Sequence, residues 1–362
     1  MEKDKLLNYS DYLKLDQLLE SQDLMSLKNG EPAHDEMLFI IVHQSYELWF
    51  KQILHELDSI LDLFGQKSIN ESDISRSVLR LNRIIEIQKL LINQIRVLET
   101  MTAMDFLEFR DHLFPSSGFQ SSQFRLIENK LGLHKDLRLK YGKHNYKDVL
   151  KKNEKVKVED SENNKTMFLL LENWLERTPF LVFDGFDFWK KYSDVIKSLL
   201  KQEEQVIRNN PKHTIDELES NLKSHDATVS AFNAFISTEK HNELIEKGEK
   251  RLSHKATKAA LLIFLYRDEP ILHSPFNLLS RLMDIDELFT NWRQRHAIMV
   301  QRMIGGKIGT GGSTGHAYLN AAADKHKVFS ELSDLSTFFI KRSALPELPK
   351  NIKEKLGYYF KS

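Results

Sequence analysis

Apolar residues recur along this chain with the period of an α-helix. The clearest pattern follows Pro32, with Asp35 at a capping position and Gly65 as a stop. Its apolar stripe alternates at spacings of four and three residues: Phe39, His43, Tyr46, Phe50, Ile53, Leu57, Ile60 and Phe64. This pattern predicts one long amphipathic helix with a histidine on its apolar face.

The same criterion predicts further helices. One runs from about Ile74 to Leu98, and a shorter one starts near Thr102, with Asp105 placed as in a capping box, and ends before Pro115. A last strong stripe consists of Ile285, Phe289, Trp292, His296, Met299 and Met303. Alternating strand patterns are almost absent, and glycine (14) and proline (8) are sparse. We therefore expect an all-α fold, a single large helical bundle.

No internal repeat and no linker divides the chain. We expect one helical domain over residues 21–350, with an N-terminal segment at 1–20 and a C-terminal tail at 351–362. Residues 147–165 are rich in Lys, Glu, Asp and Asn, so they are interpreted as a charged, solvated loop within that domain.

The charge balance points to no charged partner surface. Lys plus Arg and Asp plus Glu both number 52, so the net charge of the 362 residues is zero. We expect neither a nucleic-acid nor a membrane partner. The longest apolar runs, Met37–Val42 and Ala259–Tyr266, fall short of the roughly 20 residues of a membrane span. Met1–Asp16 lacks the apolar core of a signal peptide, so a cytoplasmic protein is expected.

The chain contains no cysteine. Disulfides, thiolate nucleophiles, iron–sulfur clusters and thiolate-ligated metals are thereby excluded. Any metal would need histidine, carboxylate or backbone ligands, and only the placement of the 14 histidines is informative.

Two histidines, His43 and His296, interrupt otherwise apolar helical stripes. One interpretation is that each is a core histidine whose ring is hydrogen-bonded inside the protein. The other is that the two faces enclose a flat cofactor, because histidine is the usual ligand of haem iron.

The stretch 305–315 holds the highest density of glycine. It follows a helix rather than a strand, and it has neither a P-loop nor a complete Gly-x-Gly-x-x-Gly motif, which argues against nucleotide binding. A flexible connector and a mobile lid over a small ligand both remain open.

Other charged groups allow both a chemical and a structural interpretation. Phe106 and Arg110 share a helix face, so Arg110 is either a carboxylate clamp or a surface ion-pair residue. The triplet at 34–36, His-Asp-Glu, contains two ligand types of non-haem iron, but acidic residues also belong at a helix start. His55-Glu56 lacks the second histidine of a zinc protease, since Ser59 occupies its place.

Long, uncommon strings in this sequence resemble the tryptophan 2,3-dioxygenases. They occur in the order of that family between Tyr9 and Leu348: Tyr9–Asp16; His34–Gln44 with Tyr46–Gln52; Phe109–Arg110 with Pro115–Gln120 and Gln123–Arg125; Trp174–Pro179; Trp292 with His296; and Gly309–Gly315. Phe106 stands where some bacterial members carry tyrosine. In the glycine loop, Thr314 and His316-Ala317 differ from the commoner sequence of the family.

The resemblance implies one haem b per subunit, active as Fe(II), in an otherwise dry site. His296 would be its axial ligand and metal-binding residue, with Trp292 beside it and Arg125 at a haem propionate. The implied substrates are L-tryptophan and O₂. Both oxygen atoms would enter the indole C2–C3 bond to give N-formyl-L-kynurenine, the first step of the kynurenine pathway.

The resemblance also implies roles for the substrate-binding residues. His43 would face the indole N–H, either as a base or only to orient the ring, and Arg110 and Thr310 would hold the carboxylate and the ammonium group. The remaining substrate-binding positions would be Phe39, Phe106, Ser117, Tyr9 and Tyr12. The two tyrosines resemble residues that reach into the site of a neighbouring subunit, which implies a homotetramer.

Two alternatives stay open at this point. One is a related haem enzyme that oxygenates another indole or aromatic metabolite; the combination of Phe39, His43, Arg110 and Thr310 argues against it. The other is a helical scaffold or haem-binding protein without enzymatic activity.

Overall fold

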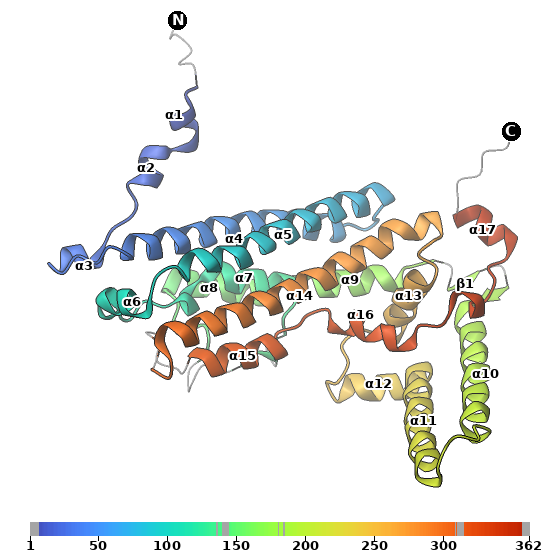
Figure 1. Cartoon of the computed structure of the whole chain (residues 1–362). Helices are drawn as coiled ribbons and strands as arrows, with labels where there is room; N and C mark the ends of the chain where they lie inside the picture. Colours follow the sequence, from blue (N-terminus) through green and yellow to red (C-terminus); the bar gives the residue numbers. More distant parts are fainter. Residues whose placement is uncertain are drawn as a thin grey trace, which may run out of the picture. The chain divides into compact units, whose positions relative to one another are not determined.

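The computed structural model describes residues 7–134, 137–139, 145–179, 181–183, 185–307, 309 and 315–356. Within these ranges almost all regular structure is helical (Figure 1). The exception is an antiparallel hairpin of two short strands, Val182–Phe183 (β1) and Phe186–Asp187 (β2). The predicted all-α fold is confirmed. Over the described part of the chain, no helix has the length and apolarity needed to cross a membrane.

Contacts between residues group the chain into two compact units, each built from three separate segments. The first comprises Met1–Leu57, Ile84–Asn164 and Glu287–Lys327, and the second comprises Asp58–Arg83, Lys165–Asp286 and Val328–Ser362. The helices Glu36–Phe64 (α4), Glu71–Leu98 (α5) and Pro270–Ile304 (α14) contribute one part to each unit. The single domain over residues 21–350 stays a prediction.

The first unit also holds the helices that lie entirely within its three segments. They are Tyr9–Leu13 (α1), Leu15–Leu19 (α2), Met25–Lys28 (α3), Ala103–Arg110 (α6), Ser122–Leu131 (α7), Lys152–Glu162 (α8) and Gly315–Lys325 (α15), with 3₁₀ turns at Asp111–Leu113 (η1) and Gly118–Gln120 (η2). The Thr102 capping box at the start of α6 is present as predicted, with Thr102 and Asp105 capping each other's backbone N–H.

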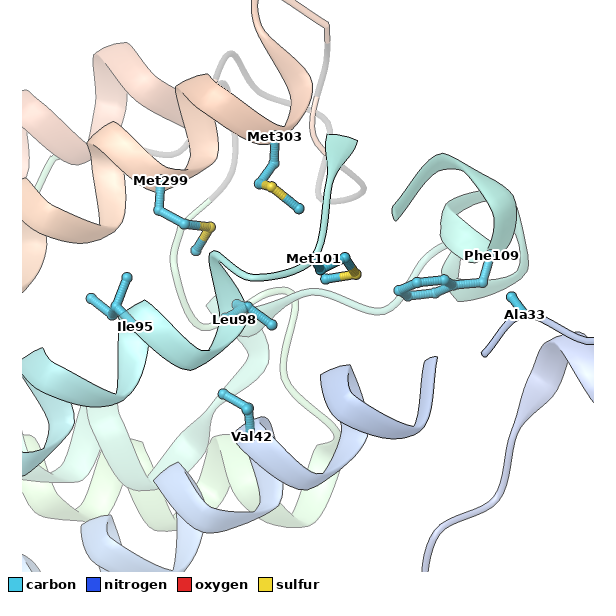
Figure 2. Packing of buried hydrophobic residues seen from close by; sticks show 8 residues of the cluster. All are labelled: Ala33, Val42, Ile95, Leu98, Met101, Phe109, Met299 and Met303. Atoms are coloured by element: carbon cyan, nitrogen blue, oxygen red, sulfur yellow. The ribbon is translucent and has the colours of Figure 1, made fainter. Parts of the chain in front are cut away.

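Apolar side chains from α4, α5, α6 and α14 pack together in the first unit. Figure 2 shows Met299 and Met303 of α14 pointing toward the end of α5, which contributes Ile95 and Leu98. Val42, Met101, Phe109 and Ala33 complete this cluster. The α4–α5 contact is also polar, because Tyr46 Oη donates to the Leu91 carbonyl oxygen at 2.6 Å. These contacts confirm that the stripes read from the sequence face the interior.

The prediction of a loop over residues 147–165 is wrong at its centre, where α8 forms. Lys and Glu are good helix formers, and the helix needs only a narrow buried face. Val158 and Ser161 are buried, and Asn129 of α7 donates to the Val158 carbonyl oxygen at 3.3 Å and to Ser161 Oγ at 2.8 Å. A highly charged segment therefore becomes a helix by docking on α7.

The second unit is built from helices of the middle and end of the chain. They are Met167–Glu176 (α9), Phe188–Arg208 (α10), Ile215–Ile236 (α11), Thr238–Glu246 (α12), His254–Leu265 (α13), Ser330–Asp334 (α16) and Lys350–Leu356 (α17), with 3₁₀ turns at Leu335–Phe338 (η4) and Arg342–Ala344 (η5). The predicted C-terminal tail at 351–362 is wrong for residues 351–356, because Ile352 and Leu356 are buried in α17. Residues 357–362 lie outside the described ranges.

A buried histidine joins three helices of the second unit. His254, at the start of α13, is 4% exposed. Its Nε2 lies 3.0 Å from the Phe235 carbonyl oxygen at the end of α11, and its Nδ1 lies 2.9 Å from Thr238 Oγ1 in α12. A carbonyl can only accept, so Nε2 carries the proton and Nδ1 accepts from the hydroxyl. Burial, with a smaller effect of the Lys258 ammonium, lowers the pKa of His254 to about 4.

We predict that His254 makes the protein less stable in mild acid. Its unfolded pKa is near 6.5 and its folded pKa about 4, so the unfolded chain binds more protons between these values. The free energy of unfolding should therefore fall by about 1.4 kcal/mol per pH unit as the pH drops through this window. Urea unfolding gives the free energy of unfolding of His254→Gln and of the wild type at about four pH values between pH 7.5 and pH 4. The difference in this free energy between the two proteins should shrink as the pH falls.

The matched control is His273→Gln, at an exposed position of α14 in the same unit. Its stability difference from the wild type should stay constant over this pH range. If the stability difference between His254→Gln and the wild type is also constant over this pH range, His254 is not the group that makes the protein sensitive to acid.

Candidate functional site

A cavity of about 290 Å³ lies within the first unit. This volume is near the lower end of the range for small-molecule sites, roughly 300–1,000 Å³. Eight of the residues predicted from the sequence line it: Phe39, His43, Phe106, Arg110, Ser117, Arg125, Trp292 and His296. They come from α4, α6, α7, α14 and the segment between α6 and η2. The structure thus brings together residues that lie more than 250 positions apart.

Three predicted site residues are not placed on this wall. Thr310 lies outside the described residues, although its neighbour Gly309 lines the cavity. Tyr9 and Tyr12 lie in the short helix α1, are 72% and 68% exposed, and are absent from the cavity lining. The contact of these two tyrosines with a neighbouring subunit stays a prediction.

His43 presents an uncharged ring to the cavity. Its Nδ1 lies 2.7 Å from the Phe39 carbonyl oxygen one turn earlier, and since that oxygen can only accept, Nδ1 carries the proton. Nε2 is then the acceptor of the ring. Burial lowers the pKa of His43, although the bond to Phe39 and the Glu47 carboxylate oppose this effect. The ring keeps accessible surface because it faces the cavity.

His296 is the second uncharged imidazole on the wall. Burial, reinforced by the nearby His43, lowers its pKa to about 4. Its Nδ1 is buried, and no atom of the described residues is a hydrogen-bond partner for it. Trp292, one turn earlier on α14, stacks on the ring at a centroid distance of 5.3 Å. A neutral imidazole with unused hydrogen-bonding capacity on an apolar wall is suited to bind a metal.

Aromatic rings make up much of the remaining wall. Phe39 lies 4.1 Å from His43 and 5.8 Å from Phe106, measured between ring centroids. On α7, the ring of Phe124 lies 5.2 Å from that of Trp292. A flat, apolar ligand can make stacking or edge contacts with such walls.

Arg110 is the last residue of α6 and one turn after Phe106. Its guanidinium lines the cavity and is mostly buried, with the adjacent Asp111 carboxylate 4.0 Å away. Ser117 caps η2, where its hydroxyl accepts from the Phe119 backbone N–H at 3.4 Å. The wall therefore combines a cation, a hydroxyl and two imidazoles with aromatic surface.

Charged residues that the sequence patterns did not single out also line the cavity. They are Glu128 of α7, Arg293 of α14 and Glu47 of α4. Glu128 is 3% exposed and accepts from Arg125 and Arg293 at 2.9 Å each. Arg125 and Glu128 are three residues apart, which in the sequence is indistinguishable from a surface ion pair on a helix. Arg293 is followed by Gln294 and Arg295, so no signal in the sequence separates it from surface residues of the helix.

The triplet at 34–36 has a structural role. The buried Glu36 carboxylate accepts from the backbone N–H groups of Met25 and Ser26 at 2.8 and 2.9 Å. It therefore fastens α3 to the start of α4, and its oxygens are already hydrogen-bonded. Over the described ranges, no group of three or more His, Cys, Asp or Glu side chains is placed to hold a bare metal ion.

The sequence of this chain is similar to those of known proteins. The family model described as tryptophan 2,3-dioxygenase matches residues 2–339. This chain belongs to the tryptophan 2,3-dioxygenase family. It is 47% identical over 351 residues to the tryptophan 2,3-dioxygenase of Dictyostelium discoideum, covering 97% of this chain and 88% of that protein.

Similar relatives come from other groups of organisms. The tryptophan 2,3-dioxygenase of Bdellovibrio bacteriovorus is 47% identical over 353 residues, covering 98% of both chains. That of Xenopus tropicalis is 47% identical over 350 residues, covering 96% of this chain and 86% of that protein. The resemblance inferred from the sequence strings is confirmed.

Proposed function

We propose that this protein is a haem-dependent dioxygenase that inserts both atoms of O₂ across the indole C2–C3 bond of L-tryptophan. The product is N-formyl-L-kynurenine, which enters the kynurenine pathway. Family membership over nearly the whole chain supports the reaction. The observation in this structure that supports the proposed reaction is that eight of the expected site residues line one cavity.

The cavity residues fit a haem. His296 is neutral and its buried Nδ1 has no hydrogen-bond partner in the described structure, so its imidazole suits an iron whose other ligands come with the cofactor. Trp292 stacks on this imidazole and keeps its orientation. Arg125 supplies a cation for a carboxylate of the cofactor. When bound, haem supplies the iron that activates O₂.

The chain's own residues bind and orient the amino acid. Arg110 pairs with the substrate carboxylate, because a guanidinium forms two parallel hydrogen bonds with a carboxylate. Thr310 receives the ammonium group. Recognition of both charged ends selects a free amino acid over indole or tryptamine, and this argues against a different indole or aromatic metabolite as substrate.

His43 holds the indole ring. Its Nδ1 proton is donated to the Phe39 carbonyl oxygen, so Nε2 accepts the indole N–H. Phe39 and Phe106 contribute ring faces and exclude water from the pocket. The lowered pKa of His43 keeps the acceptor unprotonated at neutral pH, so orienting the ring needs no proton transfer.

We further propose a homotetramer in which α1 of one subunit covers the site of its neighbour. Tyr9 and Tyr12 expose most of their surface, and no residue of α1 is buried. A helix this short has little stability alone in water, so it needs a surface to order against. Aromatic rings on such a segment would close over a bound indole.

Product identification tests the function directly. Purified protein given haem, L-tryptophan, a reductant and isotopically labelled O₂ should release N-formyl-L-kynurenine carrying two labelled oxygen atoms. His296→Ala should fold but retain little haem and form no product. A protein that is fully folded and binds no haem, or a product with one labelled atom, would refute the proposal.

Arg110→Ala tests the carboxylate clamp. Each charge-assisted hydrogen bond contributes on the order of 1.5–3 kcal/mol, and two can form. We expect kcat/KM for L-tryptophan to fall about a hundredfold or more, while turnover of tryptamine changes little. Arg96→Ala, at an exposed position of α5, is the control. An equal loss for both substrates would show that Arg110 does not read the carboxylate.

His43→Ala tests whether His43 accepts a hydrogen bond from the indole N–H. The variant should keep its haem and lose about tenfold in kcat/KM for L-tryptophan, the value of one neutral hydrogen bond of about 1.4 kcal/mol. N1-methyl-tryptophan has no indole N–H to donate. The ratio of kcat/KM for L-tryptophan to that for N1-methyl-tryptophan should therefore be smaller in the variant than in the wild type. His55→Ala, exposed on the same helix, should leave this ratio unchanged. An unchanged ratio in His43→Ala would exclude this contact.

A further inference from the structure

A buried carboxylate gathers three guanidiniums at one edge of the cavity. Glu128 accepts from Arg125 at 2.9 Å, from Arg138 at 2.6 Å and from Arg293 at 2.9 Å. All four side chains are at most 7% exposed. Burial alone would raise the pKa of the Glu128 carboxyl, but Arg138, Arg125, His326 and Arg293 hold it well below its usual range. Glu128 is therefore a carboxylate.

The fifth member, His326, adds no charge. Its Nε2 accepts from the Leu139 backbone N–H at 3.3 Å, so Nδ1, 3.5 Å from Glu128, carries the proton of a neutral ring. Burial lowers its pKa, which agrees with this state. Three guanidiniums thus share this one buried carboxylate, while Glu162 lies near Arg138 only. Cations that are buried in this way favour the approach of further anions.

Two of these cations face the cavity. Arg125, Arg293 and Glu128 line it, whereas Arg138 is not among the lining residues and packs on Tyr146, its guanidinium 4.3 Å from the ring centroid. The Arg125 Nε is buried and has no hydrogen-bond partner within the described structure. The cavity edge thus presents two cations in fixed positions, which is the complement of a pair of carboxylates.

We propose that Glu128 is a positioning residue that holds Arg125 and Arg293 as a preassembled pair of cations for the two carboxylate side chains of the haem. This inference rests on the proposed function, because it takes the cavity to be the haem site. Glu128 acts by holding α7 and α14 so that both guanidiniums meet the same edge of the cavity.

Haem retention tests this proposal without any assay of turnover. The rate of haem transfer from the full-length protein to an excess of a haem-scavenging protein is measured for haem and for haem dimethyl ester, whose carboxylates are blocked. Glu128→Gln should release haem at least tenfold faster, as for other groups that orient cofactor ligands. Release of the ester should stay near the wild-type rate, because the ester makes no charge contact with Arg125 or Arg293.

A charge-matched variant separates position from charge. Glu128→Gln combined with Arg138→Gln keeps two guanidiniums and the net charge of the wild type, yet it loses the carboxylate that positions them. This double variant should release haem as fast as Glu128→Gln. If the single variant folds poorly, the double variant still tests the proposal. Glu162→Gln is the control, since Glu162 also lies near Arg138 but away from the cavity wall. It should behave as the wild type.

Four outcomes would overturn the inference. Wild-type haem retention in the double variant would mean that net charge alone matters. Equal acceleration for haem and its ester in Glu128→Gln would mean a general structural role. Unchanged haem release in Glu128→Gln would mean no role. A wild-type protein that binds no haem would overturn the proposed function together with this inference.

Discussion

The buried carboxylate of Glu128 is the interaction on which the first unit most depends. It ties α7 to α14, to the end of α15 through His326, and to residues 137–139 through Arg138. Taking charges out of water costs several kcal/mol per ion, so this arrangement persists only because every partner is held at short distance. The same restraint fixes one edge of the cavity, because two of the partners line it. A site for a large flat ligand needs such a rigid edge, since its walls are otherwise apolar side chains that can repack.

Uncharged imidazoles complement that charged edge. His43 and His296 sit among aromatic rings, and burial lowers the pKa of both. The charges of this cavity are therefore divided. Cations lie where the carboxylates of the haem are expected, and neutral imidazoles lie where its iron and the indole N–H of the substrate are expected. Helices α4, α7 and α14 bring the imidazoles and the charged edge together, so few of these groups are neighbours in the sequence.

Helices with a wide apolar face could be predicted from the sequence, and those with a narrow one could not. The stripe of α4 continues for eight positions, so its period is unmistakable. α8 buries Val158 and Ser161 and depends on hydrogen bonds from Asn129, a contact with no periodic signature. α17 was missed for the same reason, because it is short and only Ile352 and Leu356 anchor it.

The sequence by itself determined the family, the all-α class and the residue types of the site, because long strings of residues and helical periodicity are local properties of the chain. Only the tertiary structure decided which of those residues share a cavity, which tautomer His43 adopts and that His296 lacks a partner for Nδ1 among the described residues. It also decided that Arg125, Arg138 and Arg293 share one carboxylate. These properties depend on burial and on distances between segments far apart in the chain, and neither quantity is encoded in spacing along the sequence.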